Sequence, residues 1–431
     1  MVRTAVSLVS LFVSLLVVVP ANAATTTPGR FPPGFLWGVA TSGFQSEGHF
    51  PDSNWTRYAR ENEAYGDSVD FRHRYPQDLE RASKLGVNVF RTSVEWARIE
   101  PRKGKYDWRE IRYYDDLFRH IRANGMRPMI TLNHWVHPGW VHDRGAWQNE
   151  RTVRDWLEFV RFVVKRYGAE DVMWITFNEA SQYIFHEVTD GGMPVSKVPV
   201  MSRHLIRAHR SAYDLIHRLQ PGAMVSTNVA YGSIVNGLFD AAVFNEVTDK
   251  LDFIGVDYYY GANAENLTAI NAATGAYWNV EAEPEGIYFV LKNYQKRLPK
   301  LPLYVVEAGM ATENGKPRKD GYTRSQHLRD HLYWVQRAIA DGVKVMGFNY
   351  WSLTDNYEWG SYRARFGLYT VDVKKDRELR RVPTDGVATY RSIIERRGVP
   401  AGYVPVKRPG WCSVEDPAAT CFGRVPTPPA P

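Results

Sequence analysis

Two glutamates, Glu179 and Glu307, each end a short run of residues that is typical of a buried strand. Residues 174–179 contain four aromatic or β-branched side chains and neither Pro nor Gly, and residues 303–307 are apolar up to the final glutamate. In a barrel of alternating strands and helices, the carboxyl ends of the strands share one rim, where such barrels place their chemistry. Two carboxyl groups at one rim are what the hydrolysis of a glycosidic bond requires.

Apolar runs alternate with helical patterns along the chain, an order that brings the ends of distant strands together. Strands are expected to start near Phe35, Val87, Met126, Met173, Ala223, Asp252, Leu303 and Val345. Helical patterns cover residues 76–85, 113–124, 153–167, 203–219, 284–298 and 324–341, whereas 260–283 resembles a loop. A left-handed glycine that ends a helix is expected before four strands, at Gly86, Gly125, Gly222 and Gly342. The pattern predicts an α/β fold, a single-domain (β/α)8 TIM barrel over residues 24–397.

The size and composition of the chain suit such a barrel. Its 431 residues are 44% hydrophobic, which is enough for a large core. Fourteen Trp and twenty-five Tyr offer aromatic faces that pack cores and also stack on sugar rings. The net charge of +7 is modest, and basic residues alternate with acidic ones along most helical stretches, so a nucleic-acid partner is not expected.

The N-terminal residues 1–23 have the features of a secretory signal peptide. Arg3 gives a positive start, residues 6–19 are apolar apart from serines, and Ala21-Asn22-Ala23 forms a small-residue cleavage site. The apolar run is short for a membrane span, which disfavours the alternative of an uncleaved anchor. We therefore expect a secreted protein without a membrane span after cleavage.

Residues 398–431 form a Pro-rich tail that holds both cysteines. Cys412 and Cys421 enclose a short loop, and in an oxidising compartment they favour a disulfide. A metal site is the weaker alternative, because no histidine lies near them.

Several motifs, in the same order along the chain, resemble those of glycoside hydrolase family 1. They include Thr-Phe-Asn-Glu at 176–179 and Trp-Ser-Leu-Thr-Asp-Asn-Tyr-Glu-Trp at 351–359, with further matches at 37–48, 89–96, 131–135, 252–259 and 365–368. The resemblance spans roughly residues 35–395, and the variants at 44–47 and 94–96 are similar to the archaeal-type branch. Any one motif alone would be weak, but their number and order make the resemblance specific.

The resemblance implies a role for each glutamate. Glu179 would be the general acid/base, which has to stay protonated near neutral pH until it protonates the leaving oxygen. Glu307 would be the nucleophile, which has to stay ionised beside another carboxyl and so needs a cation and hydrogen-bond donors. Arg91 and Tyr259 stand at the family positions that supply them.

The sequence departs from the family pattern around the second glutamate. The family usually has Thr-Glu-Asn-Gly there, whereas this chain has Val306-Glu307-Ala308-Gly309, and the familiar motif occurs at 312–315 instead. We assign Glu307 rather than Glu313, because only Glu307 is preceded by a strand that could aim it. Asp257 also replaces the usual Asn two residues before Tyr259. These changes are expected to affect rate and specificity more than mechanism.

The resemblance further implies a set of substrate-binding residues at the same rim: Gln45, His134, Trp135, Asn178, Trp351, Glu358, Trp359 and Phe366. Asn178 would bond the sugar 2-hydroxyl, Trp359 would stack beneath the ring, and Trp351 would face the leaving group. Judged singly, Trp351 and Phe366 could equally be core residues, and His134 a satisfied core histidine.

Three further glutamates, Glu47, Glu95 and Glu358, are interpreted from the cost of burying a charge. A buried charge is costly without a partner, so Glu358 between two aromatic residues is expected to serve the site. Glu47 and Glu95 are interpreted as structural carboxylates, ion-paired within the barrel.

These implications describe a secreted retaining β-glycosidase that hydrolyses terminal β-linked glucose- or galactose-type residues, with its carboxyl groups about 5 to 5.5 Å apart. A transglycosidase using the same intermediate and a sugar-binding barrel without turnover are the alternatives. No metal or cofactor is expected, because the histidines are scattered and no glycine-rich phosphate loop precedes a helix. The expected partner is a small β-glycoside or oligosaccharide, and the sequence leaves the oligomeric state open.

Overall fold

The structure is a computed structural model of the 431-residue chain. It describes residues 29–231, 236–263, 268, 275–410 and 412–418. The signal peptide expected at residues 1–23 and the second cysteine, Cys421, lie outside the described residues.

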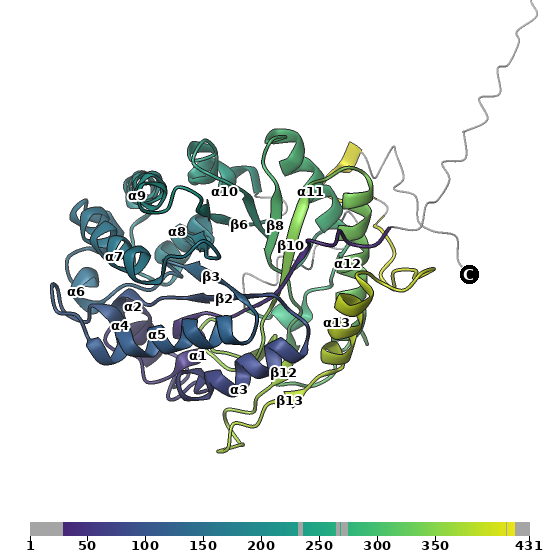
Figure 1. Ribbon diagram of the computed structural model, residues 1–431, viewed down its shortest axis with the longest axis horizontal. Coiled ribbons are helices and arrows are strands. Elements are labelled where there is room, and N and C mark those ends of the chain that lie inside the picture. Colours follow the sequence, from purple (N-terminus) through teal and green to yellow (C-terminus); the bar gives the residue numbers. More distant parts are fainter. Residues whose placement is uncertain (1–28, 232–235, 264–267, 269–274, 411, 419–431) are drawn as a thin grey trace, which may run out of the picture.

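Nine parallel strands form one sheet in the centre of the molecule (Figure 1). Their order is β5-β4-β3-β2-β1-β10-β8-β7-β6. Their bounds are β1 (Leu36–Ala40), β2 (Val89–Ser93), β3 (Arg127–Thr131), β4 (Met173–Ile175), β5 (Met224–Ser226), β6 (Asn228–Ala230), β7 (Ile254–Asp257), β8 (Leu303–Glu307) and β10 (Val345–Trp351). Only Thr227 separates β5 from β6, so the two ends of the order belong to one stretch of chain. The sheet therefore closes as a barrel of eight staves, which confirms the predicted fold.

Helices surround the sheet (Figure 1). The longer ones are α3 (Phe71–Lys84), α5 (Trp108–Ala123), α7 (Arg151–Tyr167), α9 (Val198–Leu219), α11 (Gly286–Arg297), α12 (Arg324–Ala340) and α13 (Asp385–Arg396). Helix α7 shows why these segments pack inward. Its residues Val153, Trp156, Val160 and Val163 recur at helical spacing and are all buried, so one face is apolar. Each helical pattern predicted from the sequence overlaps one of these helices.

Shorter elements complete the loops around the barrel. The short helices are α1 (Gly43–Glu47), α2 (Asn54–Arg60), α4 (Trp96–Ile99), α6 (Gly139–His142), α8 (Ala180–Thr189) and α10 (Asn236–Ala242). The 3-10 turns are η1 (Ala146–Gln148), η2 (Val195–Lys197), η4 (Phe244–Glu246) and η6 (Tyr277–Asn279), and the small strands are β9 (Thr312–Glu313), β11 (Ala364–Arg365), β12 (Tyr369–Thr370) and β13 (Val382–Pro383).

Three of the four glycines expected to end helices have left-handed backbones: Gly86, Gly125 and Gly342 have φ of 86°, 74° and 90°. The expectation for Gly222 is wrong. Helix α9 ends at Leu219. The next residue, Gln220, has an extended backbone with φ of −142°, and Pro221 follows, so no left-handed residue is needed there.

The inside of the barrel is filled by a layer of buried side chains below the rim: Val89, Met129, Met173, Ile175, Phe253, Tyr304 and Val306. Because side chains alternate along a strand, the residue two positions after Val89 also faces inward, one layer higher. That residue is Arg91. The apolar layer thus forms the floor on which the polar residues of the rim stand.

The described part of the tail lies against the barrel. Tyr403 donates to Asp330 at 2.5 Å, and the main-chain N–H of Gly410 donates to Glu285 at 2.9 Å. The domain boundary near residue 398 and the Cys412–Cys421 disulfide stay predictions. None of the helices in the described part of the chain combines the length and apolarity that crossing a bilayer requires.

Candidate active site

Glu307 at the end of β8 is held by a cation and a hydroxyl. The guanidinium of Arg91, at the middle of β2, donates to one carboxylate oxygen, and Tyr259 donates to the other at 2.6 Å. Arg91 is fully buried, and Glu307 is almost so. A charge-assisted bond from a buried guanidinium favours the ionised carboxylate, which is the state a nucleophile needs.

An irregularity in the sheet aims Glu307 at the rim. In the pairing of β7 with β8, Val256 is opposite Val305, but the next residue, Asp257, is opposite Glu307. Val306 is therefore an extra residue, and it packs in the inner layer below the rim. Strict alternation would point Glu307 away from the interior, and this bulge returns it to the inside.

Glu179 stands at the start of α8 with a left-handed backbone, φ 40° and ψ 57°. One oxygen each from Glu179, Asp257 and Glu307 lie within 4.8 Å of one another. Glu179 is partly accessible at the rim, yet enough protein surrounds its carboxyl that burial, and next the charge of Glu307, raise its pKa to about 8. It therefore carries a proton at neutral pH, as a general acid must.

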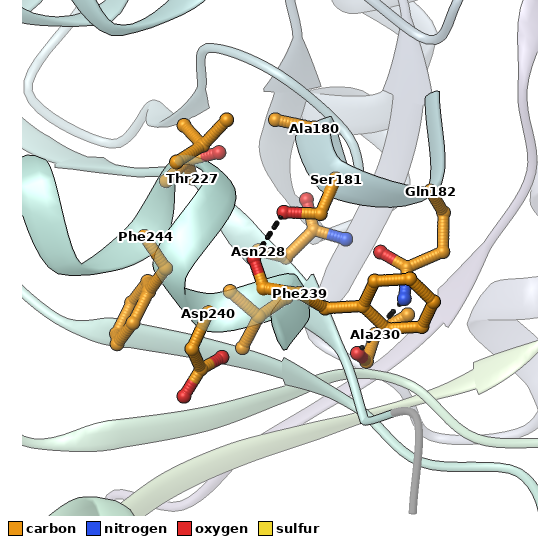
Figure 2. A pocket seen from close by; sticks show the side chains of 11 residues that line it. Ala180, Ser181, Gln182, Thr227, Asn228, Ala230, Phe239, Asp240 and Phe244 are labelled. Carbon is orange, nitrogen blue, oxygen red and sulfur yellow. Dashed lines mark hydrogen bonds between the residues drawn. The ribbon is translucent and has the colours of Figure 1, made fainter. Parts of the chain in front are cut away.

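The first turn of α8 is fixed by bonds to neighbouring segments. Figure 2 shows Ser181 and Gln182 directed at the main chain of Phe239 and Ala230, to which they donate at 2.6 and 3.2 Å. The small pocket in Figure 2 lies between this turn, the β5–β6 stave and α10. These bonds hold the helix that begins immediately after Glu179.

Asp257 at the end of β7 is the third carboxyl at the rim. It is 1% exposed and accepts a bond from the amide of Asn228. Burial, followed by the charges of Glu307 and Glu179, holds its pKa well above the usual range. Among the described residues, these three carboxyls are the one group close enough to hold a metal ion, but Arg91 and Tyr259 already occupy both oxygens of Glu307.

Asn178, immediately before Glu179, has its amide orientation fixed. Its side-chain oxygen accepts from Arg91 at 2.6 Å and from Asn228 at 2.7 Å. The amide nitrogen must then point away from both donors, and it is free to donate to a ligand. The indole of Trp135 donates to the main-chain oxygen of Asn178 at 2.8 Å, so this aromatic residue supports the position of Asn178.

Glu358 is buried next to Trp351 and Gln45. The indole of Trp351 donates to Glu358 at 2.9 Å, and Gln45, whose oxygen accepts from Ser42 at 2.6 Å, faces this carboxyl. Burial raises the pKa of Glu358 to about 8. A neutral acid at this place can both donate and accept, which suits binding to a hydroxyl group.

The remaining predicted residues form an aromatic surround. The imidazole of His134 stacks on Trp351 with centroids 5.8 Å apart, and burial keeps its pKa well below the usual range. Its Nδ1 is buried and has no hydrogen-bond partner within the described part of the chain. Trp359 is 37% exposed and meets Trp135 edge-on at 5.2 Å. Phe366 is buried against Tyr259 at 5.7 Å. Of these, Trp359 is the one with a face open for stacking.

The family of the chain is decided by comparison with known proteins. The model of glycosyl hydrolase family 1 matches residues 27–237 and 236–399, which is most of the chain. The chain belongs to glycosyl hydrolase family 1. It is a glycoside hydrolase of the retaining β-glycosidase type.

The relatives of this family 1 chain share a quarter to a third of its residues. β-Glucosidase A of Thermotoga maritima is 27% identical over 448 residues, covering 86% of this chain and 99% of its own. The β-galactosidase of Sulfolobus acidocaldarius is 28% identical, covering 86% and 96%. A galactolipid galactosyltransferase of Arabidopsis thaliana is 30% identical over 346 residues, covering 70% and 54%. The solved structure of the T. maritima β-glucosidase with deoxynojirimycin has a TM-score of 0.74 at 24% identity, covering 86% and 100%, which supports the barrel.

The family-like motif at 312–315 has a different role from the stretch around Glu307. Glu313 lies in the short strand β9, and its carboxylate pairs with Arg363 at 2.6 Å. Asn314 and Gly315 follow with φ of 50° and 74°. The main-chain N–H of Lys316 donates to the main-chain oxygen of Glu313 at 2.9 Å, so Asn314 and Gly315 form the centre of a tight turn, and turn geometry explains this sequence.

The two carboxylates interpreted as structural differ in their partners. Glu47 is buried and paired with Arg98 at 2.5 Å, as expected. Glu95 has no ion pair among the described residues, so that part of the interpretation is wrong. It accepts from Ser93 at 2.5 Å and from the N–H of Phe44 at 3.3 Å, and burial raises its pKa to about 8.

Sequence reasoning missed two residues of this family 1 site. Asn228, which connects Asn178 with Asp257, follows an apolar run, and the rule that polar residues at strand ends serve the rim could have found it. Tyr277 comes from the loop after β7 and lies beside Phe366 and Trp359, with centroids 6.1 and 6.5 Å away. No periodic signal in that loop could have indicated it.

Proposed function

We propose that this family 1 enzyme is a secreted β-glycosidase that removes terminal β-linked glucose- or galactose-type residues, with Glu307 as nucleophile and Glu179 as acid/base. One observation carries the assignment. Arg91 and Tyr259 donate to the two carboxylate oxygens of Glu307, while Glu179, with an oxygen no more than 4.8 Å away, stays protonated at neutral pH. Inverting enzymes separate their carboxyls by about 6.5 to 9.5 Å, so the short separation supports the retaining route.

The chemistry follows from these two protonation states. Glu307 attacks the anomeric carbon while Glu179 gives its proton to the glycosidic oxygen, and the bond to the leaving group breaks. Glu179, now a carboxylate, takes a proton from water as the water oxygen displaces Glu307 from the sugar. The released sugar keeps its configuration, and both carboxyls return to their starting states.

Recognition of the sugar is supported by the polar groups at the rim. The amide nitrogen of Asn178 is free to donate to the 2-hydroxyl, a bond that strengthens in the transition state. Glu358, Gln45 and His134 offer further donors and acceptors, and the half-exposed ring of Trp359 offers a stacking surface. This arrangement favours a monosaccharide unit bound end-on.

The preference between glucose and galactose rests on names of relatives alone, which include both a β-glucosidase and a β-galactosidase. Screening purified mature protein against 4-nitrophenyl β-glucoside and β-galactoside measures it directly. A ratio of kcat/KM values above about ten would identify one sugar as the preferred substrate.

Glu307→Gly tests the nucleophile. The variant should lose turnover of aryl β-glucosides, and added azide should restore product as the glycosyl azide of inverted configuration. Glu313→Gly is the matched control, since it removes a glutamate in a family-like motif that lies outside the cluster formed by Glu179, Asp257 and Glu307. If Glu307→Gly keeps activity while Glu313→Gly loses it, the assignment is wrong.

Transglycosylation is a second candidate, supported by the 30% identity to a galactosyltransferase. It uses the same glycosyl-enzyme, with a sugar hydroxyl in place of water. Product analysis with added acceptor sugars separates the two outcomes. A sugar-binding barrel without turnover is the third candidate, and a 2-fluoro glycosyl-enzyme detected by mass spectrometry on Glu307 would exclude it.

Secretion is proposed from the signal-like residues 1–23. Export with a signal peptide predicts that the N-terminus of the mature protein is Ala24, which N-terminal sequencing reads. Peptide mapping without reductant should then recover Cys412 and Cys421 in one disulfide-linked peptide. A retained N-terminus in the membrane fraction would favour the anchor instead.

A further inference from the structure

Three carboxyl groups, those of Glu179, Asp257 and Glu307, meet one guanidinium at the rim of the described structure. The available hydrogen-bond donors are not divided equally among them. Glu307 takes both the guanidinium of Arg91 and the hydroxyl of Tyr259. Glu179 and Asp257 are left without a cation among the described residues, although each has an oxygen within 4.8 Å of the other. If all three were ionised, three negative charges would face one positive charge in a buried place, which is strongly unfavourable.

The contacts of Asp257 indicate where the remaining proton lies. One of its oxygens, Oδ2, accepts from the amide of Asn228. The other, Oδ1, is buried and has no hydrogen-bond donor among the described residues. The carboxyl of Glu179 lies within hydrogen-bond reach of Asp257. A proton held between the two carboxyls is favoured here, because a buried carboxylate oxygen left without a donor is costly.

We propose that Asp257 is a positioning residue that shares one proton with Glu179 and thereby keeps that proton on the pair up to higher pH. The inference rests on the proposed role of Glu179 as acid/base. It concerns a residue at which this chain differs from the usual Asn of its family, so it describes a property of this enzyme rather than of the family.

The groups that face the pair agree with this assignment. Glu179 is faced by Glu307 from β8, Asp257 from β7, Arg91 from β2 and Glu358 from the loop after β10. Three of these four are acids, and the one cation is bonded to Glu307. Asp257 is faced by the same Glu307 and Arg91 and by the neutral amide of Asn228. The surroundings thus favour holding a proton on the pair.

The reaction conserves charge in this cluster. Before attack, Glu307 is ionised and the Glu179–Asp257 pair has one proton, which gives two negative charges. After the leaving group has taken that proton, Glu307 is a neutral ester, and Glu179 and Asp257 are both carboxylates, so two negative charges remain. The proton taken from water in the second step returns to the pair. Sharing the proton therefore makes the last proton of the pair harder to remove, without adding net charge during glycosylation.

The test is the pH dependence of kcat/KM for an alkyl β-glucoside, whose leaving group needs an acid. Replacing Asp257 by Asn keeps the shape of the side chain and an oxygen that can accept from the amide of Asn228, but it removes the ionisable carboxyl. At high pH kcat/KM falls as the acid loses its proton, and we expect Asp257→Asn to move this alkaline limb of the pH profile to lower pH by about one unit or more. Glu187→Gln is the matched control, because it removes another buried carboxyl, on α8 but outside the cluster, and should leave the limb in place.

A second measurement keeps the test independent of turnover. Titration of the carboxyl carbon of Glu179 by 13C NMR, assigned with Glu179→Gln, should show the same downward shift in Asp257→Asn. An unmoved alkaline limb or an unmoved titration in a folded variant overturns the inference.

Failure of the proposed function has a separate signature. Glu179→Ala should lose alkyl glucoside hydrolysis while keeping 2,4-dinitrophenyl glucoside cleavage to the glycosyl-enzyme. If Glu179→Ala affects both substrates equally, the acid/base role itself fails. If it behaves as expected and Asp257→Asn shifts nothing, the role of Glu179 stands and only the inference on Asp257 falls.

Discussion

Arg91 joins Glu307 to Asn178: one guanidinium nitrogen donates to the carboxylate, and the other donates to the amide oxygen at 2.6 Å. The proposed nucleophile and the residue that would hold the sugar 2-hydroxyl are thereby both fixed to one rigid, fully buried side chain. Attack distance and sugar orientation are therefore set together rather than independently.

Arg91→Lys should lower kcat/KM for aryl glucosides by about 10²- to 10³-fold. A lysine ammonium keeps the charge but cannot reach Thr131, Asn178 and Glu307 at once, as the planar guanidinium does. Steady-state kinetics measures the loss. Arg363→Lys, at the exposed pair with Glu313, is the control and should stay within about twofold.

Tyr259→Phe should lower kcat/KM by about tenfold to a hundredfold with no change in fold, because the phenol supplies the second donor to Glu307 at 2.6 Å. Kinetics together with circular dichroism checks both parts. Activity within twofold of the parent enzyme would show that this bond is dispensable in the reacting complex.

The alkaline limb of kcat/KM should lie near pH 8. The pKa of Glu179 is raised to about 8, so below this pH the residue holds the proton it must donate, and above it the proton is lost and activity falls. The pKa of Glu358 is also raised to about 8, so the assignment needs a variant. Glu179→Gln should abolish the limb for a dinitrophenyl glucoside; persistence of the limb would point to Glu358.

Glu187→Gln should change how stability depends on pH. Burial raises the pKa of Glu187 to about 7, from its ordinary value of 4.5. Between these values the folded protein binds more protons than the unfolded chain, so the free energy of unfolding falls as pH rises, by about 3 kcal/mol in total. Urea unfolding at pH 5 and pH 8 should show a smaller difference in the variant. An equal difference would mean that Glu187 ionises without cost.

The barrel could be predicted because its signals are local and repeated. Each stave shows a short apolar run and each covering helix a buried stripe such as that of α7, so an error in one element does not disturb the others. The rim residues Arg91, Glu179 and Glu307 were also identifiable, since polar residues at the ends of such strands have few structural reasons to be there.

Contacts between distant segments were not predictable in the same way. Asn228 matters because it reaches both Asn178 and Asp257, and Tyr277 because its loop folds over the rim. Neither relation leaves a trace in periodicity. The wrong expectations have physical reasons too: Pro221 makes a left-handed Gly222 unnecessary, and Glu95 is satisfied by neutral donors rather than a cation.

The extra residue Val306 has a consequence for the packing of this barrel. Deleting Val306 would restore regular pairing with β7 and keep the carboxylate opposite Asp257 on the inner face, but it would remove one apolar side chain from the floor. Loss of this one codon would thus open a void beneath the site while the carboxylate stayed in place, so the extra residue itself serves the packing of the barrel rather than the direction of the proposed nucleophile.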